Sequence, residues 1–204
     1  NATTIYEIRK NSTLLNFIMT NCPELKTKTL RERMVSSSAG ACLLAFTMGL
    51  GDRHLENILV TKTGYLVHVD FGYVLGDDPK HAATPMRITE DMVDTMGGKN
   101  SSTFHSFIQR TQKGYATMRM HADFWYHLLA AEYYIFQDHS RPPKRIHEHI
   151  LNRFVPGEWH SEASLQIQTV VQQAAETSWV QKLSDFTHSA SISLDDLLNT
   201  QRKY

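Results

Sequence analysis

Four polar side chains in a short stretch of this sequence have the types and the spacing that phosphoryl transfer requires. Asp52 and His54 stand two residues apart, Asn57 follows, and Asp70 opens the triplet Asp-Phe-Gly. A carboxylate or an imidazole can take or orient the proton of an attacking hydroxyl, and the reference pKa of His, about 6.5, suits a base at neutral pH. Carboxylate and amide oxygens are ligands that Mg²⁺ accepts. The stretch therefore predicts a site where Asp52 or His54 activates a hydroxyl and Asn57 and Asp70 hold the metal.

The elements around this stretch should bring those side chains together. Residues 29–48 are rich in small and apolar side chains and predict a helix that stops at Gly49. Residues 58–69 place apolar, β-branched runs on both sides of a glycine-containing turn, which predicts a β-hairpin. Because a hairpin returns the chain to its starting edge, Asn57 and Asp70 should lie within reach of one metal ion, about 4–5 Å apart or less.

Most of the remaining chain has the three- and four-residue apolar spacing of helices. We therefore predict a mainly α fold with one small β-hairpin. The aromatic group of the helix over 115–136 is expected to be core, since it alternates with Leu and Ala at helical spacing. Helices are predicted over residues 1–21, 90–96 (capped by Thr89), 103–112, 115–136, 143–154, 161–178 and 179–188, with a short turn over 194–198 capped by Ser193.

Length and composition limit the possible functions. The chain has 204 residues, 41% of them hydrophobic, and a formal net charge of zero. This predicts one domain or lobe with no global field that would recruit nucleic acid. No apolar run reaches the roughly 20 residues that a membrane-spanning helix needs. Cys22 and Cys42 form no disulfide framework or zinc pattern, so we expect a reducing compartment.

The motif order resembles one family of kinases. Ordinary protein kinases read His-Arg-Asp in the catalytic loop, with Asn five residues after the Asp and a later Asp-Phe-Gly. Here the order at 52–54 is Asp-Arg-His, which resembles the phosphoinositide 3-/4-kinase superfamily. Residues 37–46 resemble the helix that leads into that family's catalytic loop, and residues 71–80 and 92–98 are most similar to class III phosphatidylinositol 3-kinases.

The resemblance implies a domain organisation. Residues 1–188 would be the C-terminal lobe of a kinase, and residues 189–204 a C-terminal tail. The lobe would contain a catalytic loop at 49–57, the metal-binding Asp-Phe-Gly at 70–72 and an activation loop at 72–86. A glycine-rich phosphate loop and a phosphate-binding Lys are not found before Arg33. We therefore expect the N-terminal lobe to come from another segment or chain.

The resemblance also implies roles for single residues. Arg53 joins Asp52 and His54 in the predicted catalytic set, as the anchor of the loop, and the division of labour between Asp52 and His54 stays open. Asn57 and Asp70 would bind ATP through Mg²⁺, with Mn²⁺ as an alternative. The residues expected to contact a lipid head group are Gly72, Tyr73, Lys80 and His81.

The expected reaction is the ATP-dependent phosphorylation of phosphatidylinositol. The activation loop has only two basic residues, beside the acidic Asp77 and Asp78, which favours a head group without further phosphates. Family likeness favours the 3-position, and the 4-position stays open. The expected partners are a phosphatidylinositol-containing membrane and regulatory or scaffold subunits, without nucleic acid. The expected location is cytoplasmic, peripheral on endomembranes, in membrane trafficking.

Two other functions remain open at this point. The first is a serine/threonine protein kinase of the same superfamily, which is disfavoured because residues 189–204 offer only Tyr204 where those enzymes end in an aromatic-rich tail. The second is a non-catalytic scaffold that retains kinase helices inside a larger complex. The intact motif residues count against the scaffold, and the missing lobe counts for it.

Overall fold

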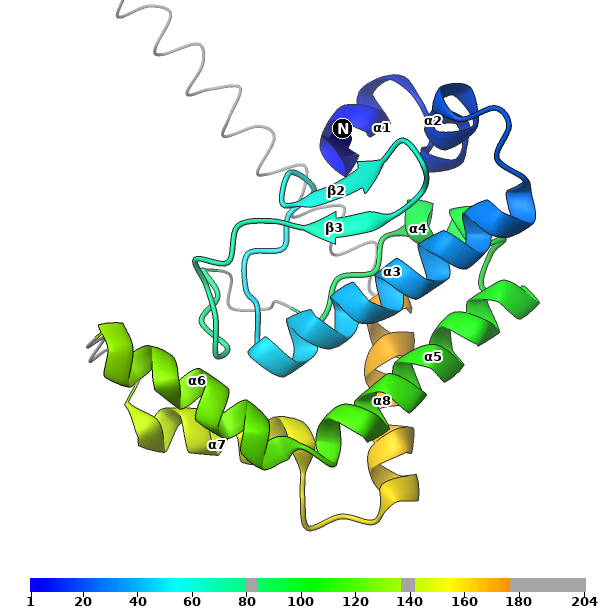
Figure 1. Ribbon diagram of the computed structural model, residues 1–204. Helices are drawn as coiled ribbons and strands as arrows, with labels where there is room; N and C mark the ends of the chain where they lie inside the picture. The colour runs from blue at the N-terminus through cyan, green and yellow to red at the C-terminus, as the bar shows by residue number, and fades with distance from the viewer. Residues whose placement is uncertain (80–83, 137–141, 177–204) are drawn as a thin grey trace, which may run out of the picture.

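The computed structural model describes residues 1–79, 84–136 and 142–176, and it is mostly helical with one small sheet (Figure 1). The long helix α3 lies at the centre, with the sheet on one side of it and α5 on the other. The elements in chain order are β1 (Ala2–Thr4), α1 (Ile5–Asn11), α2 (Leu14–Asn21), α3 (Thr27–Met48), β2 (Ile58–Thr61), β3 (Leu66–His68), α4 (Glu90–Thr95), α5 (Ser102–Arg119), α6 (Ala122–Phe136), α7 (Pro143–Phe154) and α8 (His160–Glu176).

The predicted hairpin is confirmed as β2 and β3, which pair antiparallel with Leu59 opposite Val67. Its turn is closed by Gly64, which has φ +87° and donates its N–H to the Thr61 carbonyl at 3.0 Å. The prediction of a single hairpin was incomplete, because β1 adds a third antiparallel strand to the free edge of β2. Three residues are too few for an alternating pattern to be recognised in the sequence.

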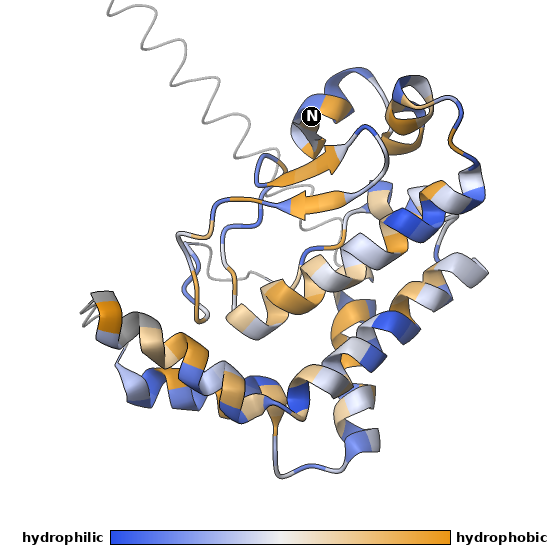
Figure 2. Cartoon of the chain, in the orientation of Figure 1, coloured by the Kyte–Doolittle hydropathy of each residue, from blue (hydrophilic) through white to orange (hydrophobic). Residues whose placement is uncertain are grey.

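Helix α3 is the element around which the core is built. Its buried apolar side chains belong to the same cluster as those of the hairpin strands and α5. Figure 2 shows hydrophobic positions along both the hairpin strands and α3. On the α5 side the approach is close: a Cβ on Gly114 would lie 2.4 Å from Leu43 Cδ1. Cys42 is fully buried in the middle of the helix, and burial raises the pKa of its thiol to about 12. Gly49, in a left-handed conformation, ends the helix as predicted.

Two helix boundaries differ from prediction. The predicted single helix over 1–21 is divided at Ser12, and Thr13 caps α2 by accepting the Asn16 N–H at 3.2 Å. The break expected near Gly114 is at Met120 and His121 instead, so that α5 runs on to Arg119. Gly114 has a packing reason to be in the helix interior, since it is the residue that lets α5 approach Leu43.

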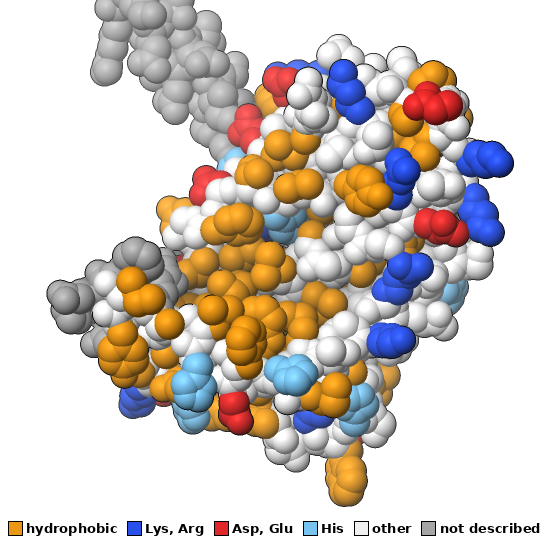
Figure 3. All heavy atoms as spheres, viewed as in Figure 1, with side chains coloured by type: hydrophobic (Ala, Val, Ile, Leu, Met, Phe, Trp, Pro, Cys, Tyr) orange, Lys and Arg blue, Asp and Glu red, His pale blue; other side chains and the backbone are white. Residues whose placement is uncertain are grey.

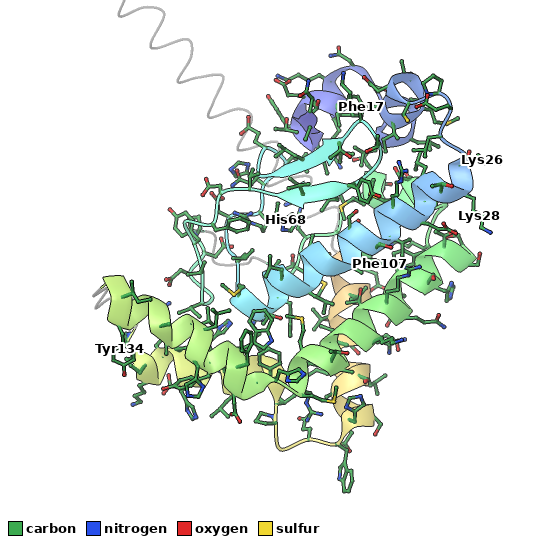
Figure 4. All side chains as sticks on the ribbon, viewed as in Figure 1. Phe17, Lys26, Lys28, His68, Phe107 and Tyr134 are labelled. Atoms are coloured by element: carbon green, nitrogen blue, oxygen red, sulfur yellow. The ribbon has the colours of Figure 1, made fainter. Side chains whose placement is uncertain are left out.

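The prediction that the aromatic group of α6 is core was wrong for part of the helix. Phe124 and Tyr134 are 60% and 68% exposed, whereas Trp125 and Tyr126 pack partly buried against the core. Tyr134 lies at the outer end of α6 (Figure 4), and apolar side chains gather on this face over α6 and the nearby end of α3 (Figure 3). α6 packs mainly on α7. Because apolar side chains surround α6, contact with α7 buries only some of them.

The remaining helices follow the predictions closely. Thr89 caps α4 by accepting the Met92 N–H at 3.3 Å, α7 begins at the second of two prolines, and α8 spans nearly the predicted residues. The helix predicted over 179–188 and the turn over 194–198 lie outside the described residues. Across the described ranges, no helix combines the length and the apolar character needed to cross a membrane.

Candidate functional site

Arg53 holds the predicted catalytic loop against the end of the hairpin. Its side chain is buried, with Nε donating to the Gly51 carbonyl at 2.8 Å and Nη1 to the Val69 carbonyl at 2.7 Å. Nη2 donates to the carbonyl of Asp70. Burial lowers the pKa of the guanidinium, and the negative charges of nearby Asp residues oppose that change. One cation thus ties the loop that carries Asp52 to the segment that carries Asp70.

Asp52 and His54 lie side by side, and their geometry distinguishes them. The Glu56 N–H donates to His54 Nδ1 at 3.2 Å, so Nδ1 is an acceptor and a neutral ring carries its proton on Nε2. His54 Nε2 lies 3.7 Å from Asp52 Oδ2. In this tautomer the Nε2–H of the imidazole lies beside the Asp52 carboxylate, whose oxygens are acceptors.

Asn57 and Asp70 stand at the foot of the hairpin, Asn57 directly before β2 and Asp70 two residues after β3. The Val69 N–H donates to the Asn57 carbonyl at 3.1 Å, which closes the hairpin directly beside both residues. Asn57 is buried and donates its Nδ2–H to the Asp52 carbonyl at 3.0 Å, so the amide oxygen is left as its acceptor. Asp70 Oδ1 accepts the Gly72 N–H at 3.2 Å.

This donor set fits a hard divalent cation. It offers one carboxylate and one neutral amide oxygen, and Mg²⁺ is commonly bound by few protein oxygens plus phosphate and water. In the part of the chain that the structure describes, no group of three or more His, Cys, Asp or Glu could hold a metal ion. The metal site at Asn57 and Asp70 stays a prediction.

The predicted catalytic carboxylate, of Asp52, and the predicted metal-binding carboxylate, of Asp70, both belong to residues with left-handed backbones. Asp52 has φ +52° and Asp70 has φ +59°. For residues other than Gly this conformation costs roughly 1–3 kcal/mol and persists only where surrounding bonds impose it. Here the Asp52 carbonyl accepts from Asn57 Nδ2 and the Asp70 carbonyl accepts from Arg53 Nη2, and these bonds help to hold the two backbones in that conformation.

The first part of the predicted activation loop lies against the catalytic loop. The Tyr73 carbonyl accepts the Gly51 N–H at 3.0 Å, while the Tyr73 side chain is 42% exposed. Gly72 is exposed beside it. Lys80 and His81, the basic residues expected to contact a head group, lie outside the described residues. Two of the four residues predicted to contact the substrate are therefore close to the site: Gly72 is hydrogen-bonded to Asp70, and Tyr73 to Gly51.

Two buried histidines near the site were not predicted to have a part in it. His149 on α7 is one, with its Nε2 2.8 Å from the Thr47 carbonyl at the end of α3. Burial lowers the pKa of His149. His68 lies at the end of β3 on the side of α3 (Figure 4), and burial with the nearby Arg53 charge lowers its pKa to about 4. Neither ring nitrogen of His68 has a hydrogen-bond partner among the described residues.

The sequence did not reveal the hydrogen bonds that His149 and Asp78 make near the site, because their partners are remote in the chain. His149 reaches Thr47 across 102 residues, and the Asp52 N–H donates to Asp78 Oδ2 at 2.9 Å across 26. No local spacing marks such pairs. The one available signal was Gly51, whose Cβ would lie 2.0 Å from the Asp77 carbonyl oxygen and which therefore indicates a close backbone approach.

The sequence is similar to known lipid kinases over its N-terminal two-thirds. Residues 5–137 match the family described as phosphatidylinositol 3- and 4-kinase. The chain is 44% identical over 92 residues to the phosphatidylinositol 3-kinase catalytic subunit type 3 of Caenorhabditis elegans, which covers 45% of this chain and 10% of that protein. It is 46% identical over 76 residues to phosphatidylinositol 3-kinase pik3 of Schizosaccharomyces pombe, covering 37% and 10%.

A third relative agrees with these two. Phosphatidylinositol 3-kinase VPS34 of Saccharomyces cerevisiae is 38% identical over 91 residues, covering 45% of this chain and 10% of the relative. The matched part of the chain thus spans about a tenth of the length of each of these proteins. The family match covers more than half of the chain and includes the catalytic loop, the hairpin and the Asp-Phe-Gly triplet. The chain belongs to the phosphatidylinositol 3- and 4-kinase family.

Proposed function

We propose that this chain is the catalytic and metal-binding lobe of a kinase that transfers the γ-phosphoryl group of ATP to phosphatidylinositol, at the 3-position. The observation that carries the proposal is the bridge made by Arg53 between the Gly51, Val69 and Asp70 carbonyls. That bridge holds Asp52 and His54 beside Asn57 and Asp70, in a family whose relatives are named phosphatidylinositol 3-kinases.

In this proposal the protein supplies positioning and charge rather than covalent chemistry. Asp52 accepts or orients the proton of the inositol hydroxyl, since its carboxylate is the acceptor of the pair. His54 directs its Nε2–H toward the same space, where a donor would stabilise negative charge on the transferring group. Asn57 and Asp70 would hold Mg²⁺, or Mn²⁺, which when bound neutralises charge on the nucleotide phosphates.

The exposed beginning of the activation loop is the proposed contact with the lipid head group. Phe71 and Tyr73 are 51% and 42% exposed there, and the scarcity of basic residues in the loop supports unphosphorylated phosphatidylinositol as the substrate. The enzyme would act at the surface of endomembranes. A glycine-rich loop and a phosphate-binding Lys would come from a small lobe on another segment or on a partner subunit.

A transfer assay tests the proposal. The chain is incubated with labelled ATP and Mg²⁺, once alone and once together with a small lobe. Three substrates are compared: vesicles of phosphatidylinositol, vesicles of its phosphorylated forms, and a Ser/Thr peptide. We expect transfer to phosphatidylinositol only when the small lobe is present, and loss of that transfer in Asp52→Ala. Preferential labelling of the peptide would favour a protein kinase instead. Absence of all transfer with a small lobe bound and ATP present would favour a scaffold.

A further inference from the structure

The beginning of the activation loop is hydrogen-bonded to the end of α3 and to the catalytic loop over several residues. The Leu75 N–H donates to the Met48 carbonyl at 2.8 Å, and the Gly76 N–H donates to the Gly49 carbonyl at 2.9 Å. The next residues continue this contact, because the Asp78 Cα is 3.0 Å from where a Cβ of Gly51 would be. The two loops therefore lie backbone against backbone.

Asp78 extends this contact to the residue that the proposed reaction depends on. Its Oδ2 accepts the backbone N–H of Asp52 at 2.9 Å. On the other side of Asp52, the carbonyl accepts Nδ2–H of Asn57 at 3.0 Å. Asp52 has the left-handed φ of +52°, which a non-glycine residue keeps only when its surroundings impose it. Among the described residues, the Asp78 carboxylate and the Asn57 amide thus both hold the main chain of Asp52.

The neighbouring carboxylate has a different role. Asp77 Oδ1 accepts from the Arg145 guanidinium on α7, so the pair of acidic residues joins the loop to α7 through Asp77 and to Asp52 through Asp78. From the sequence alone, Asp77 and Asp78 were only negative charges in a loop predicted to contact a lipid head group. The geometry gives Asp78 an intramolecular partner, and that partner is the proposed proton acceptor.

We propose that Asp78 is a positioning residue, which holds Asp52 in its left-handed conformation and so orients the carboxylate toward the substrate hydroxyl. The inference rests on the proposed function and adds a second role to the activation loop. The loop that would contact the lipid head group also fixes the backbone of Asp52. A displacement of the loop therefore reorients Asp52, and a misplacement of about 1 Å can cost about 10²-fold in rate.

Two variants of Asp78 test the proposal. Asp78→Ala removes the acceptor, and Asp78→Asn keeps an oxygen acceptor at the same distance while removing the charge. Glu148→Ala, which removes an exposed carboxylate from α7, is the control. Asp78 is only partly buried, so we expect each variant to fold. Asp78→Thr, whose shorter side chain places its oxygen away from the Asp52 N–H, replaces the Ala variant if that one fails to fold.

The first measurement is amide hydrogen exchange at Asp52, on the whole chain and without any assay of activity. We expect Asp78→Ala to raise the exchange rate of the Asp52 N–H at least about 10-fold, because the bond that protects it is gone. Asp78→Asn and Glu148→Ala should stay within about 3-fold of the wild-type rate. Exchange at the wild-type rate in Asp78→Ala would overturn the proposal.

The second measurement is steady-state kinetics in the assembly that contains the small lobe. We expect Asp78→Ala to lower kcat about 10- to 100-fold with the KM for ATP within about 2-fold, and Asp78→Asn to recover most of that loss. Equal damage in the Ala and Asn variants would overturn the positioning role. If no protein, wild type included, transfers phosphate, the proposed function fails, and the exchange measurement still decides whether Asp78 holds Asp52.

Discussion

The loops around Asp52 and the helix α6 show two different ways in which this chain specifies structure. Around Asp52 the backbone is irregular, two carboxylate-bearing residues have positive φ, and several individual hydrogen bonds hold one loop to the other. In α6 the backbone is regular, and the apolar side chains Phe124 and Leu128 are 60% and 49% exposed. In the first region, geometry depends on particular pairs of atoms. In the second it depends on helical periodicity and partial burial, so substitutions in the two regions should have different consequences.

The largest expected effect is on catalysis, from Asp70→Asn in the active assembly. The variant should lower turnover at least about 100-fold while the thermal unfolding midpoint changes little, since an exposed carboxylate with the proposed metal-binding role would contribute to the transition state and not to packing. Turnover and thermal melting measured on the same preparations check this. Near-normal phosphorylation would contradict the role given to Asp70.

A matched pair of glycines tests the backbone contact between the loops. Gly51→Ala should lower turnover roughly 30-fold, because its Cβ would lie 2.0 Å from the Asp77 carbonyl oxygen and must displace residues 77–78 from Asp52. Gly40→Ala, at an exposed position of α3 where an added Cβ would meet nothing within 4 Å, should leave turnover unchanged and raise stability by about 0.5–1 kcal/mol. Equal kinetics in the two variants would show that the loops are not held as described.

Two adjacent leucines test the α6 side of the comparison. Leu129 is 4% exposed and Leu128 is 49% exposed. Leu129→Ala should lower the free energy of unfolding by about 2–3 kcal/mol, through lost burial and a cavity, whereas Leu128→Ala should change it by about 0.5 kcal/mol or less. Denaturant unfolding measures both. A large loss in Leu128→Ala would mean that this face of α6 is covered.

The smallest expected effect is a pH dependence of stability from His149. Burial lowers its pKa in the folded state, and the nearby positive charges of Arg153 and Arg145 lower it further, against the opposing bond to the Thr47 carbonyl. The unfolded state therefore binds more protons below the ordinary His pKa of about 6.5, and stability falls as the pH is lowered through that range.

His149→Gln is the matched variant, since it keeps a donor for the Thr47 carbonyl and removes the titrating group. The free energy of unfolding of the variant should fall less steeply between about pH 7 and pH 5 than that of the wild type. His68 has a lowered pKa as well and should contribute a similar slope to both proteins. Parallel pH profiles would show that His149 does not titrate differently in the two states.

Local patterns were sufficient to predict most of the fold. The hairpin, the glycine at the end of α3, the Thr89 cap and the proline start of α7 follow from residues within a few positions of one another. The errors occurred where distant contacts decide. Strand β1 exists because residues 2–4 meet β2, and α5 continues past Gly114 because of the close approach to Leu43.

The same division holds for the candidate site. The hairpin that the motif implied is present, with Asp52 and His54 in the loop before it and Asn57 and Asp70 flanking its strands. The chemical roles of these four residues stay predictions. The motif gave no indication of the left-handed φ of Asp52 or of the Asp78 carboxylate that accepts from its N–H. Spacing along the chain reports which groups are present, whereas their orientation depends on partners that only folding brings near.

Cys42 allows the opening of the core around α3 to be measured as a rate of chemical modification. Its thiol is fully buried in α3, and its pKa is raised to about 12, so the folded protein holds almost no thiolate there at neutral pH and should resist alkylation. The thiol donates to the Arg87 carbonyl at 3.8 Å, so reaction requires that α3 and the segment around Arg87 first separate. The alkylation kinetics at this one position would therefore report how often the core around α3 opens, with Cys22, 8% exposed at the end of α2, as an internal comparison from the periphery.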